Sequence, residues 1–529
     1  MSTAVRDTGP GAYADGTGTF HPPERRIVGG ARIGGERVVS VDACVIGSGA
    51  GGAPVAKELA EGGLRVAILE EGDWHETSSL TARPRDMAPR LYRDGGQFAT
   101  VGTPPIVLPL GRAVGGTTLV NSGTCFRTPA HVLERWREDF GLAALTPEAL
   151  EPCFRRVERI LNVSQVPEAL AGRNALLVKR GAEALGLRGD FLFRNAKGCV
   201  GSGVCAFGCP SGAKQHVGIT YVPRAWAAGA TTYTGVRARG VVMDGPRARE
   251  VVAATAGGGT LRVRCDLVVV ACGALLTPGL LRRSGLGDGS GQLGRNLSIH
   301  PASAARAVFE EPVDPWDGVP QSYYVDALAR EGILLEGIAG PPDQAAMATP
   351  GSGATHRERM LDVRRTASFG VMVSDTARGT VRDVRGRPLV RYDLHPRDAA
   401  RFQRGFELLA QIYWAAGARE VLVPLAGVPP LRDGDAGPLR RAAIRPRDVQ
   451  AMAFHPLGTA RAGTDPATAV VDGDLRVHGT ENVHVADGSV VPSAVGVNPQ
   501  ITIMALATRL AFGLLGSPLP DEPAPSKIV

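Results

Sequence analysis

The chain has 529 residues and a net charge of +7, and its 44% hydrophobic and 21% charged residues are ordinary for a protein with a large buried core. The arginines that give the positive charge are scattered, with no basic run interleaved with aromatic residues, so nucleic-acid binding has little support. Residues 1–21 lack the apolar core of a signal peptide, and the apolar stretch 501–516 is too short to span a bilayer. We therefore expect a cytoplasmic protein without a transmembrane segment.

Patterns along the chain predict a mixed α/β protein, α+β overall. We expect a Rossmann-like nucleotide-binding domain interwoven with a smaller substrate-binding domain that contains an antiparallel sheet. Gly, Pro and Thr are frequent before residue 37, where we expect a loosely packed arm. The expected boundaries are 1–36 for the arm, 37–145, 220–300 and 447–518 for the nucleotide-binding domain, 146–219 for a helical and Cys-rich insertion, and 301–446 for the substrate-binding domain.

The stretch 41–72 is typical of a βαβ unit that binds a dinucleotide. An apolar run at 43–46 leads into Gly47, Gly49 and Gly52 in GxGxxG spacing, and an Ala- and Leu-rich segment follows. In such a unit the first glycine permits the tight turn, the second lets the backbone approach a pyrophosphate, and the third lets the helix pack closely. A second apolar run ends at Glu70, whose carboxylate can accept hydrogen bonds from ribose hydroxyls.

The next segments supply loops, helices and strands. The stretch 108–129 has an open Gly-rich backbone with small hydroxyl donors, which can lie against a cofactor. Two helices are predicted within 146–185, and a further helical piece begins at 221. Residues 231–270 alternate like a small β-meander, whose last apolar run, 267–270, is expected to rejoin the nucleotide-binding sheet. The pieces SFGVMVSD and LVRYDL are predicted strands of the substrate-binding domain.

Three cysteines lie close together in the loop CVGSGVCAFGCPSGAK. Cys199, Cys205 and Cys209 could ligate zinc or iron, because the glycines would let the loop wrap an ion. Their spacing is not that of a standard CxxC pair, and a fourth ligand is missing unless His216 or a distant cysteine supplies it. We therefore predict no metal, and a tight turn of reduced cysteines is the favoured interpretation.

Two residues near the C-terminal end have chemistry suited to a substrate oxygen. His455 stands in AMAFHPLGT, where the apolar approach breaks at Pro456 and can present the imidazole to a cavity. An imidazole with a pKa of about 6.5 can accept a proton at neutral pH. Residue chemistry alone favours the alternative, a core histidine bonded to its own loop. Asn498 precedes Pro499, and in that position Asn is a typical helix N-cap.

Four blocks of the chain carry a resemblance to a known family. In chain order they are VIGSGAGGAPVAKELAEGGLRVAILEEG, GRAVGGTTLVNSG, FHPLGTARAG and VHVADGSVVPSAVGVNPQITIMALATRLA. In that order and spacing they resemble the glucose-methanol-choline (GMC) family of FAD-dependent oxidoreductases, over residues 41–513 with a weaker middle third. The resemblance implies a Rossmann-like FAD-binding domain and FAD as the cofactor.

On the matching positions, the resemblance implies a set of FAD contacts. The glycine turn and Glu70 would hold the ADP half, the GG loop and the C-terminal block would line the flavin, and the backbone of Val236 would meet the adenine. Some relatives carry a histidine in the GG loop that bonds covalently to the flavin. This chain has Leu119 and Val120 there, so we expect non-covalent FAD. The expected cofactor-binding residues are Gly47, Gly49, Gly52, Glu70, Arg112, Gly115, Gly116, Thr117, Asn121, Val236, Asp487, Gly488 and Pro499.

The resemblance also reverses the preference at His455, since HPLGT matches the block that carries the family's catalytic histidine. It implies that His455 accepts the hydroxyl proton of an alcohol, that Asn498 orients the forming alkoxide, and that hydride passes to flavin N5. A helix that begins at Pro499 and points at the flavin would stabilise the negative charge of the reduced ring. His300, in GRNLSIHPAS, is expected to have a structural role.

The expected activity is oxidation of an alcohol, with O2 or another compound as the electron acceptor. The Cys-rich loop and SFGVMVSDTARGTV resemble the long-chain alcohol branch and bacterial dehydrogenases that oxidise a sugar hydroxymethyl group in aminoglycoside biosynthesis. Candidate substrates are therefore long-chain alcohols and the 6'-hydroxymethyl group of amino sugars. A lyase that keeps FAD structurally and a non-catalytic flavin-binding protein stay open. An NAD-dependent dehydrogenase is disfavoured, because such a fold has no use for the GG loop. The oligomeric state is left open.

Overall fold

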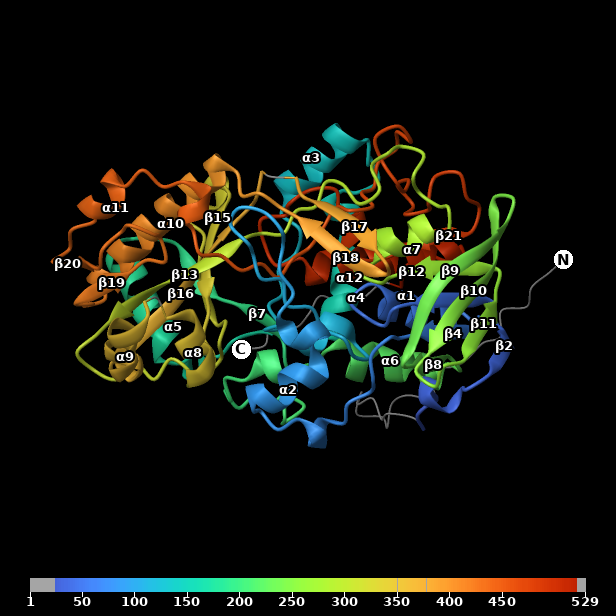
Figure 1. Cartoon of the computed structure of the whole chain (residues 1–529), viewed down its shortest axis with the longest axis horizontal. Helices are drawn as coiled ribbons and strands as arrows, with labels where there is room; N and C mark the ends of the chain where they lie inside the picture. The colour runs from blue at the N-terminus through green and yellow to red at the C-terminus, as the bar shows by residue number, and fades with distance from the viewer. Residues whose placement is uncertain (1–23, 350, 377, 521–529) are drawn as a thin grey trace.

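The computed structural model describes residues 24–349, 351–376 and 378–520. A parallel sheet forms the centre of one half of the molecule, with the spatial order β1-β8-β4-β3-β12-β21 (Figure 1). The central strands β4, β3 and β12 are continuous apolar runs, because both faces of the sheet are covered. The strands are β1 (Ile27–Gly29), β3 (Ala43–Ile46), β4 (Val66–Leu69), β8 (Thr231–Thr234), β12 (Leu267–Val270) and β21 (Val483–Val485).

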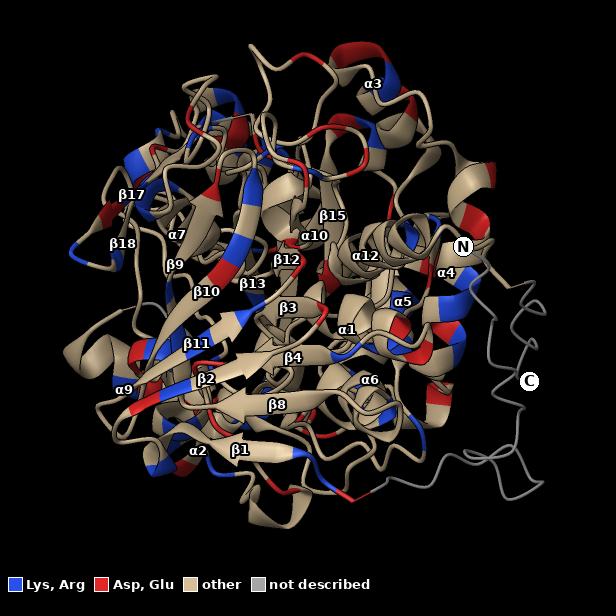
Figure 2. Cartoon of the chain, turned by 90° about the vertical axis from the view of Figure 1, so that its right-hand side faces the viewer, with Lys and Arg blue, Asp and Glu red and all other residues tan. Residues whose placement is uncertain are grey.

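Helices cover one face of this sheet and a second sheet covers the other (Figure 2). The helical layer contains α1 (Gly52–Glu61), α6 (Val217–Ala227) and α12 (Gln500–Leu515). The opposite layer is a sheet of order β2-β11-β10-β9, built from β2 (Glu36–Ser40), β9 (Val236–Asp244), β10 (Arg247–Thr255) and β11 (Thr260–Arg264). The predicted βαβ unit is therefore β3-α1-β4, and the predicted meander is β9 to β11. As predicted, β12 returns to the parallel sheet beside β3.

The prediction of a loosely packed arm is wrong for its last part, which contains β1 and the first residue of β2. β1 pairs in parallel with β8, which places Ile27–Gly29 at the edge of the central sheet. β2 begins at Glu36 and pairs with β11. Both strands are held by partners more than 200 residues away in sequence, which composition alone does not reveal. The part of the expected arm before residue 24 lies outside the described residues.

An antiparallel sheet of order β20-β19-β13-β16-β15-β14-β6 dominates the other half of the molecule (Figure 1). Helices α5 (Arg173–Ala184) and α10 (Pro396–Ala415) pack on one of its faces. The predicted strand SFGVMVSD is most of β16, and LVRYDL overlaps β18. The sheet's strands are β6 (Gly189–Phe191), β13 (Ala302–Val308), β14 (Tyr323–Val325), β15 (Ile333–Gly337), β16 (Thr366–Val373), β19 (Glu420–Leu422) and β20 (Leu431–Arg432).

Each half has its own hydrophobic core, and the segment 146–219 contributes to both. Helix α4 (Pro147–Ile160) packs on α12 in the first core, whereas α5 belongs to the second. The segment expected as one insertion is thus divided between the halves. The other named elements are α2 (Pro84–Leu91), α3 (Ala130–Phe140), β5 (Val163–Gln165), β7 (Phe193–Asn195), α7 (Thr277–Arg283), α8 (Pro342–Ala348), α9 (Gly353–Leu361), β17 (Thr380–Val384), β18 (Arg387–Arg391) and α11 (Gly437–Arg441), with short 3-10 turns between them.

Over the described part of the chain, none of the helices is both long enough and apolar enough to cross a membrane.

Candidate active site

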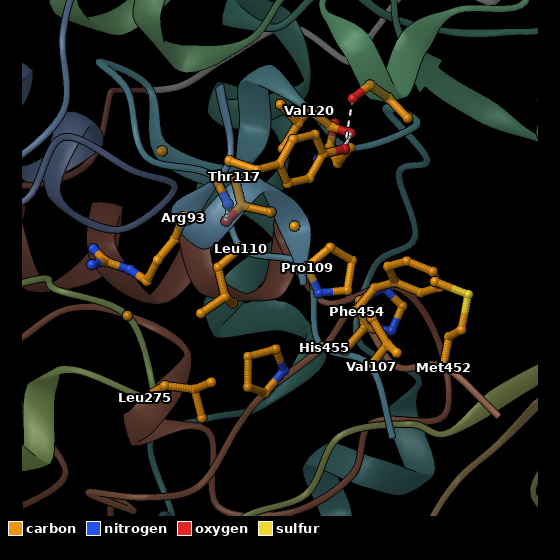
Figure 3. Close-up of a pocket in the computed structure, with 18 of the residues that line it drawn as sticks. Arg93, Val107, Pro109, Leu110, Thr117, Val120, Leu275, Met452, Phe454 and His455 are labelled. Carbon is orange, nitrogen blue, oxygen red and sulfur yellow. Dashed lines mark hydrogen bonds between the residues drawn. The ribbon is translucent and has the colours of Figure 1, made fainter. Parts of the chain in front are cut away.

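A cavity of about 1230 Å³ lies between the two halves and is lined by residues of both. This volume exceeds the roughly 300–1,000 Å³ typical of a site for one small ligand, and it suits a dinucleotide together with a substrate. Figure 3 shows His455 near Phe454, Met452 and Val107, with Arg93 farther away on the other side of the cavity.

Most of the predicted site residues meet at this cavity. Gly52 and Gly115 do not line it, because they pack against other backbone segments. A Cβ on Gly52 would lie 1.9 Å from the Gly47 oxygen, and one on Gly115 would lie 3.0 Å from the Gly218 nitrogen. The predicted residues that do line the cavity are Gly47, Gly49, Glu70, Arg112, Gly116, Thr117, Asn121, Val236, His455, Asp487, Gly488, Asn498 and Pro499.

The glycine turn after β3 is packed tightly on one side and open on the other. Gly47 has a φ of +107°, and a Cβ there would lie 2.2 Å from the Ala271 oxygen. A Cβ on Gly51 would lie 1.5 Å from the Ala486 oxygen, so this turn requires glycine. In contrast, a Cβ on Gly49 would meet only Gly116 Cα, at 3.9 Å. The backbone at Gly49 therefore faces the cavity, as a pyrophosphate site requires.

The Glu70 carboxylate joins this turn to its surroundings. Its Oε2 accepts hydrogen bonds from Ser48 N at 3.1 Å and Ser48 Oγ at 2.5 Å, and its Oε1 accepts one from Gly72 N at 2.8 Å. Burial raises the pKa of Glu70, although the hydrogen bonds from these three donors act to lower it. Ser48 Oγ in turn accepts a hydrogen bond from Gly115 N at 3.0 Å, which links the turn to the GG loop. The predicted contact of Glu70 with ribose stays a prediction.

A second acidic residue at this end was not singled out from the sequence. Glu71 also lines the cavity and forms an ion pair with Arg93 at 2.8 Å. Arg112 and Arg237 lie 3.7 Å and 4.0 Å from the same carboxylate. In the sequence, Glu71 is marked only by its position next to Glu70. That position does not reveal the three arginines, which come from distant segments of the chain.

The C-terminal block contributes a carboxylate that connects neighbouring segments and the start of helix α12. The Asp487 carboxylate accepts hydrogen bonds from Gly273 N at 2.9 Å, Thr277 Oγ1 at 2.5 Å and Ser489 N at 2.8 Å. Helix α12 begins at Gln500 with Pro499 as its N-cap and without a capping side chain. The predicted N-cap interpretation of Asn498 is therefore wrong, because its side chain turns to the cavity instead. The free amides at the start of α12 favour negative charge there.

Two histidines and an asparagine form one connected group at the substrate end. His455 Nε2 lies 3.4 Å from Asn498 Nδ2, and His455 Nδ1 lies 3.3 Å from His300 Nδ1. Burial, with a smaller contribution from His300, lowers the pKa of His455 well below its ordinary value. His300, which was expected to have a structural role, is in direct contact with His455.

His300 is held in an unusual backbone conformation. It has a φ of +47°, in the left-handed region that non-glycine residues rarely adopt. The partly buried Asp375 carboxylate accepts hydrogen bonds from His300 N at 3.2 Å, Ile299 N at 3.1 Å and Ser298 Oγ at 2.6 Å. Ser298 also pairs with Leu457 through the backbone. These bonds fix the His300 turn against the segment that carries His455.

Glu336, a carboxyl group in the wall of the cavity, was not predicted from the sequence. It lies on β15 in the otherwise apolar strand ILLEG and is 6% exposed. Its Oε2 has no hydrogen-bond partner. Burial raises the pKa of Glu336 to about 7, and a hydrogen bond with Asn498 opposes this shift. In the sequence, the one indication of a site here is an acidic residue inside an otherwise apolar strand.

The three cysteines of the Cys-rich loop do not line the large cavity, although Ala206 and Phe207 of the same loop do, and they lie around a small void. Arg194 Nη2 donates to Cys205 Sγ at 3.2 Å, and the buried Lys214 ammonium donates to the Cys205 oxygen at 2.7 Å. Within the described ranges, no group of three His, Cys, Asp or Glu side chains is placed to hold an ion, so the metal alternative for Cys199, Cys205 and Cys209 has no support.

A glycine-rich dinucleotide groove that ends beside an imidazole in an apolar chamber is typical of flavin-dependent oxidoreductases. Comparison with family models matches residues 88–302 and 375–507 to the two parts of GMC oxidoreductase. The chain is also 45% identical to an uncharacterised GMC-type oxidoreductase of Mycobacterium tuberculosis, over 90% of this chain and 76% of that protein. The chain belongs to the GMC oxidoreductase family, and it is an FAD-dependent oxidoreductase that acts on CH-OH groups.

Other relatives have more specific names. Paromamine 6'-oxidase of Streptomyces fradiae is 29% identical over 90% of this chain and 91% of its own length. A long-chain-alcohol oxidase of Arabidopsis thaliana is 29% identical over 90% of this chain and 69% of its own length. Among solved structures, pyridoxine 4-oxidase from Mesorbium loti is similar in fold, with a TM-score of 0.70 and 20% identity, covering 89% of this chain and 98% of that chain.

The residues present fit FAD, the cofactor of the family. Gly49 leaves the backbone open to a pyrophosphate, and α12 directs unpaired amides at the cavity. Val236 lies at the end of the cavity where Glu71 is held by arginines. When bound, FAD supplies the acceptor for a hydride. The chain's own residues supply the positions, the donors and the enclosure.

Proposed function

We propose that this enzyme oxidises a primary hydroxyl group to an aldehyde by hydride transfer to N5 of a non-covalently bound FAD. The observation that carries the proposal is the placement of His455 and Asn498 side by side in the wall of the same cavity that the glycine turn opens into. In this proposal His455 accepts the hydroxyl proton, Asn498 orients the forming alkoxide, and the predicted cofactor residues hold FAD. The absence of a histidine at Leu119 and Val120 supports non-covalent binding.

Apolar side chains line the part of the cavity beside these residues. Val107, Met452 and Phe454 lie there next to His455 (Figure 3). The neighbouring sheet also contributes polar residues to the cavity, among them Ser303, Arg306, Glu336 and Ser368. The relatives' names add two candidates, a long-chain alcohol and the 6'-hydroxymethyl group of an amino sugar, the second of which would place the enzyme in antibiotic biosynthesis. O2 or another compound would reoxidise the flavin.

Anaerobic reduction of the bound flavin tests this proposal. The purified yellow protein is mixed with fatty, steroid, aryl and amino-sugar alcohols, and the visible flavin absorbance is followed. We expect at least one class to bleach the flavin, and His455→Ala to slow bleaching by roughly 10²–10⁴-fold. His131→Ala, at an exposed histidine on α3, is the matched control and should bleach at the parental rate. A flavin that no alcohol reduces would contradict the proposal and favour a lyase or a non-catalytic flavoprotein.

The linkage of the cofactor is checked separately. Acid denaturation followed by filtration should release all of the yellow colour into the filtrate, because no covalent bond is expected. Colour that stays with the precipitated protein would contradict non-covalent binding.

A further inference from the structure

A buried carboxylate in the wall of the cavity is left without a positive partner. Glu336 is 6% exposed and lines the cavity from β15, and its Oε2 has no hydrogen-bond partner. Burial raises the pKa of Glu336, and a hydrogen bond with Asn498 is the influence that opposes burial. Within the described part of the chain, no positive side chain contributes to this pKa. A buried charge is costly unless it is paired, so a group that enters the cavity can stabilise Glu336.

The neighbours of Glu336 on the antiparallel sheet are small. Its register partner on β16 is Gly370, which pairs in turn with Ala304 on β13. Directly paired residues point to the same face of a sheet. Gly370 and Ala304 line the cavity together with Glu336, and neither has a side chain longer than a methyl group. The space over this row of the sheet therefore lets a ligand group reach Oε2 from the cavity.

The arginines that line the cavity have other partners. Arg306 lies on the same sheet, but its guanidinium donates to the Ala345 oxygen at 3.0 Å and to Thr349 Oγ1. Glu336 is not among the groups that shift the pKa of Arg306, which burial lowers to about 10. At the nucleotide end of the cavity, three further arginines surround the carboxylate of Glu71. None of these four arginines is placed as the counter-ion of Glu336.

Asn498 connects Glu336 to the place where the alcohol is oxidised in the proposed function. Its Nδ2 lies 3.4 Å from His455 Nε2, and its side chain also shares a hydrogen bond with the Glu336 carboxylate. With a hydrogen bond of ordinary length on that side, a Glu336 oxygen lies within roughly 7 Å of His455 Nε2. A ligand that contacts both His455 and Glu336 therefore needs two polar groups that are separated by a few carbon atoms.

The unpaired atoms at this position indicate the chemistry of the second polar group. Glu336 Oε2 and Asn498 Oδ1 are both buried, both without a partner, and both hydrogen-bond acceptors. A protonated amino group has three donors and no acceptor, and its charge compensates that of the carboxylate. A hydroxyl group has one donor and leaves the charge of Glu336 unpaired. The site therefore fits an ammonium group better than a neutral one.

We propose that Glu336 binds a protonated amino group of the substrate, a few carbon atoms away from the hydroxyl group that is oxidised, with Asn498 Oδ1 as a second acceptor. The assignment rests on the proposed alcohol oxidation and gives it a substrate class, the amino alcohols. Of the two candidates named above, an amino sugar supplies such a group, whereas a long-chain alcohol leaves Glu336 unpaired. Glu336 selects the substrate in this assignment, and His455 remains the base.

Anaerobic flavin reduction by paired alcohols tests this assignment. Unbranched amino alcohols of about three to six carbon atoms are each compared with the alcohol in which a methyl group replaces the amino group, and glucosamine is compared with glucose. The pH is about 8, so that Glu336, with a pKa of about 7, is ionised. For at least one pair, the parental enzyme should reach half of its maximal reduction rate at an at least about tenfold lower concentration of the amino compound. A parental enzyme without such a preference would overturn the proposal.

Substitutions at Glu336 assign the preference to this carboxylate. Glu336→Gln keeps an acceptor for Asn498 but removes the charge, so the preference should fall to within about twofold while the neutral alcohol still reduces the flavin. Glu336→Asp, which keeps the charge, should retain part of the preference. Glu331→Gln, at an exposed carboxylate just before β15, should keep all of it. A Glu336→Gln enzyme with the parental preference would overturn the proposal.

Binding of an amine without a hydroxyl group tests the site without turnover. Titration calorimetry of the holoenzyme with butylamine should give an at least about tenfold lower affinity in Glu336→Gln than in the parental protein and in Glu331→Gln. Equal affinities in all three proteins would overturn the proposal. If no alcohol reduces the parental flavin, the proposed function fails, whereas butylamine binding that depends on Glu336 would still support the amino-group site.

Discussion

Ser48 connects two loops that are predicted to contact the cofactor, although it was not singled out from the sequence. Its hydroxyl donates to Glu70 and accepts from Gly115 N, which joins the glycine turn to the GG loop. Ser48→Ala removes one donor from a buried carboxylate, so we expect FAD affinity to fall by about tenfold, equivalent to about 1.4 kcal/mol. Fluorescence titration of the apoprotein with FAD measures this. The exposed Ser40→Ala serves as control, and equal affinities in the two variants would contradict the account.

Lys214 holds the same cofactor loop from the other side. Its buried ammonium donates to the oxygens of Leu119, Asn121 and Cys205 at 2.6–2.7 Å. Lys214→Met leaves these buried oxygens without a donor, so we expect a loss of at least about 2 kcal/mol in the free energy of unfolding. Urea unfolding measures the change. Lys197→Met, at an exposed lysine of the same region, should be nearly neutral.

At the scale of elements, an ion pair locks α4 onto α1. Arg156 on α4 donates to both Glu58 oxygens, at 2.7 Å and 2.8 Å, and Lys57 lies 3.0 Å from the same carboxylate. Burial alone would raise the pKa of Glu58, but the hydrogen bonds from Arg156 and the charge of Lys57 outweigh it and lower the pKa. Glu58→Gln breaks a buried pair and should cost roughly 3–5 kcal/mol, whereas the partly exposed Glu61→Gln should cost under about 1 kcal/mol.

The same pair makes stability depend on pH. Because the folded pKa of Glu58 is lowered, its contribution is fully present above the unfolded value of about 4.3 and is lost as the pH falls through the folded value. Between pH 6 and acid pH of about 3, the parental protein should therefore lose more stability than Glu58→Gln does. Urea unfolding at each pH measures this loss of stability. Equal losses in the two proteins would contradict this assignment.

Elements with a local signal could be predicted, and those that depend on distant partners could not. The unit β3-α1-β4 follows from apolar periodicity and glycine spacing, and β12 from its continuous apolar run. β1 has only three residues and is recognisable only beside β8. Glu336 reaches the cavity through the register of β14, β15 and β16, and the contact between His300 and His455 joins residues 155 apart. Such positions depend on tertiary pairing, which one sequence does not reveal.

At the scale of the whole molecule, the cavity lies where two separate hydrophobic cores meet. FAD bound there would stabilise the folded state by mass action, by about 2.7 kcal/mol at a free concentration of 100 times Kd. We therefore expect the apoprotein to melt at a lower temperature than the holoenzyme, with Tm rising as FAD is added. Calorimetry measures this, and a Tm that does not respond to FAD would contradict the placement of the cofactor in this cavity.

A crystal structure of the yellow holoenzyme, grown with an unreactive analogue of its best alcohol, tests the central claim most directly. We expect the FAD pyrophosphate at the Gly47–Gly52 turn, the flavin ring beside the start of α12, and the analogue's oxygen within hydrogen-bond distance of His455 Nε2 and of Asn498. A flavin ring far from His455, or an analogue bound outside the chamber lined by Glu336, would contradict it.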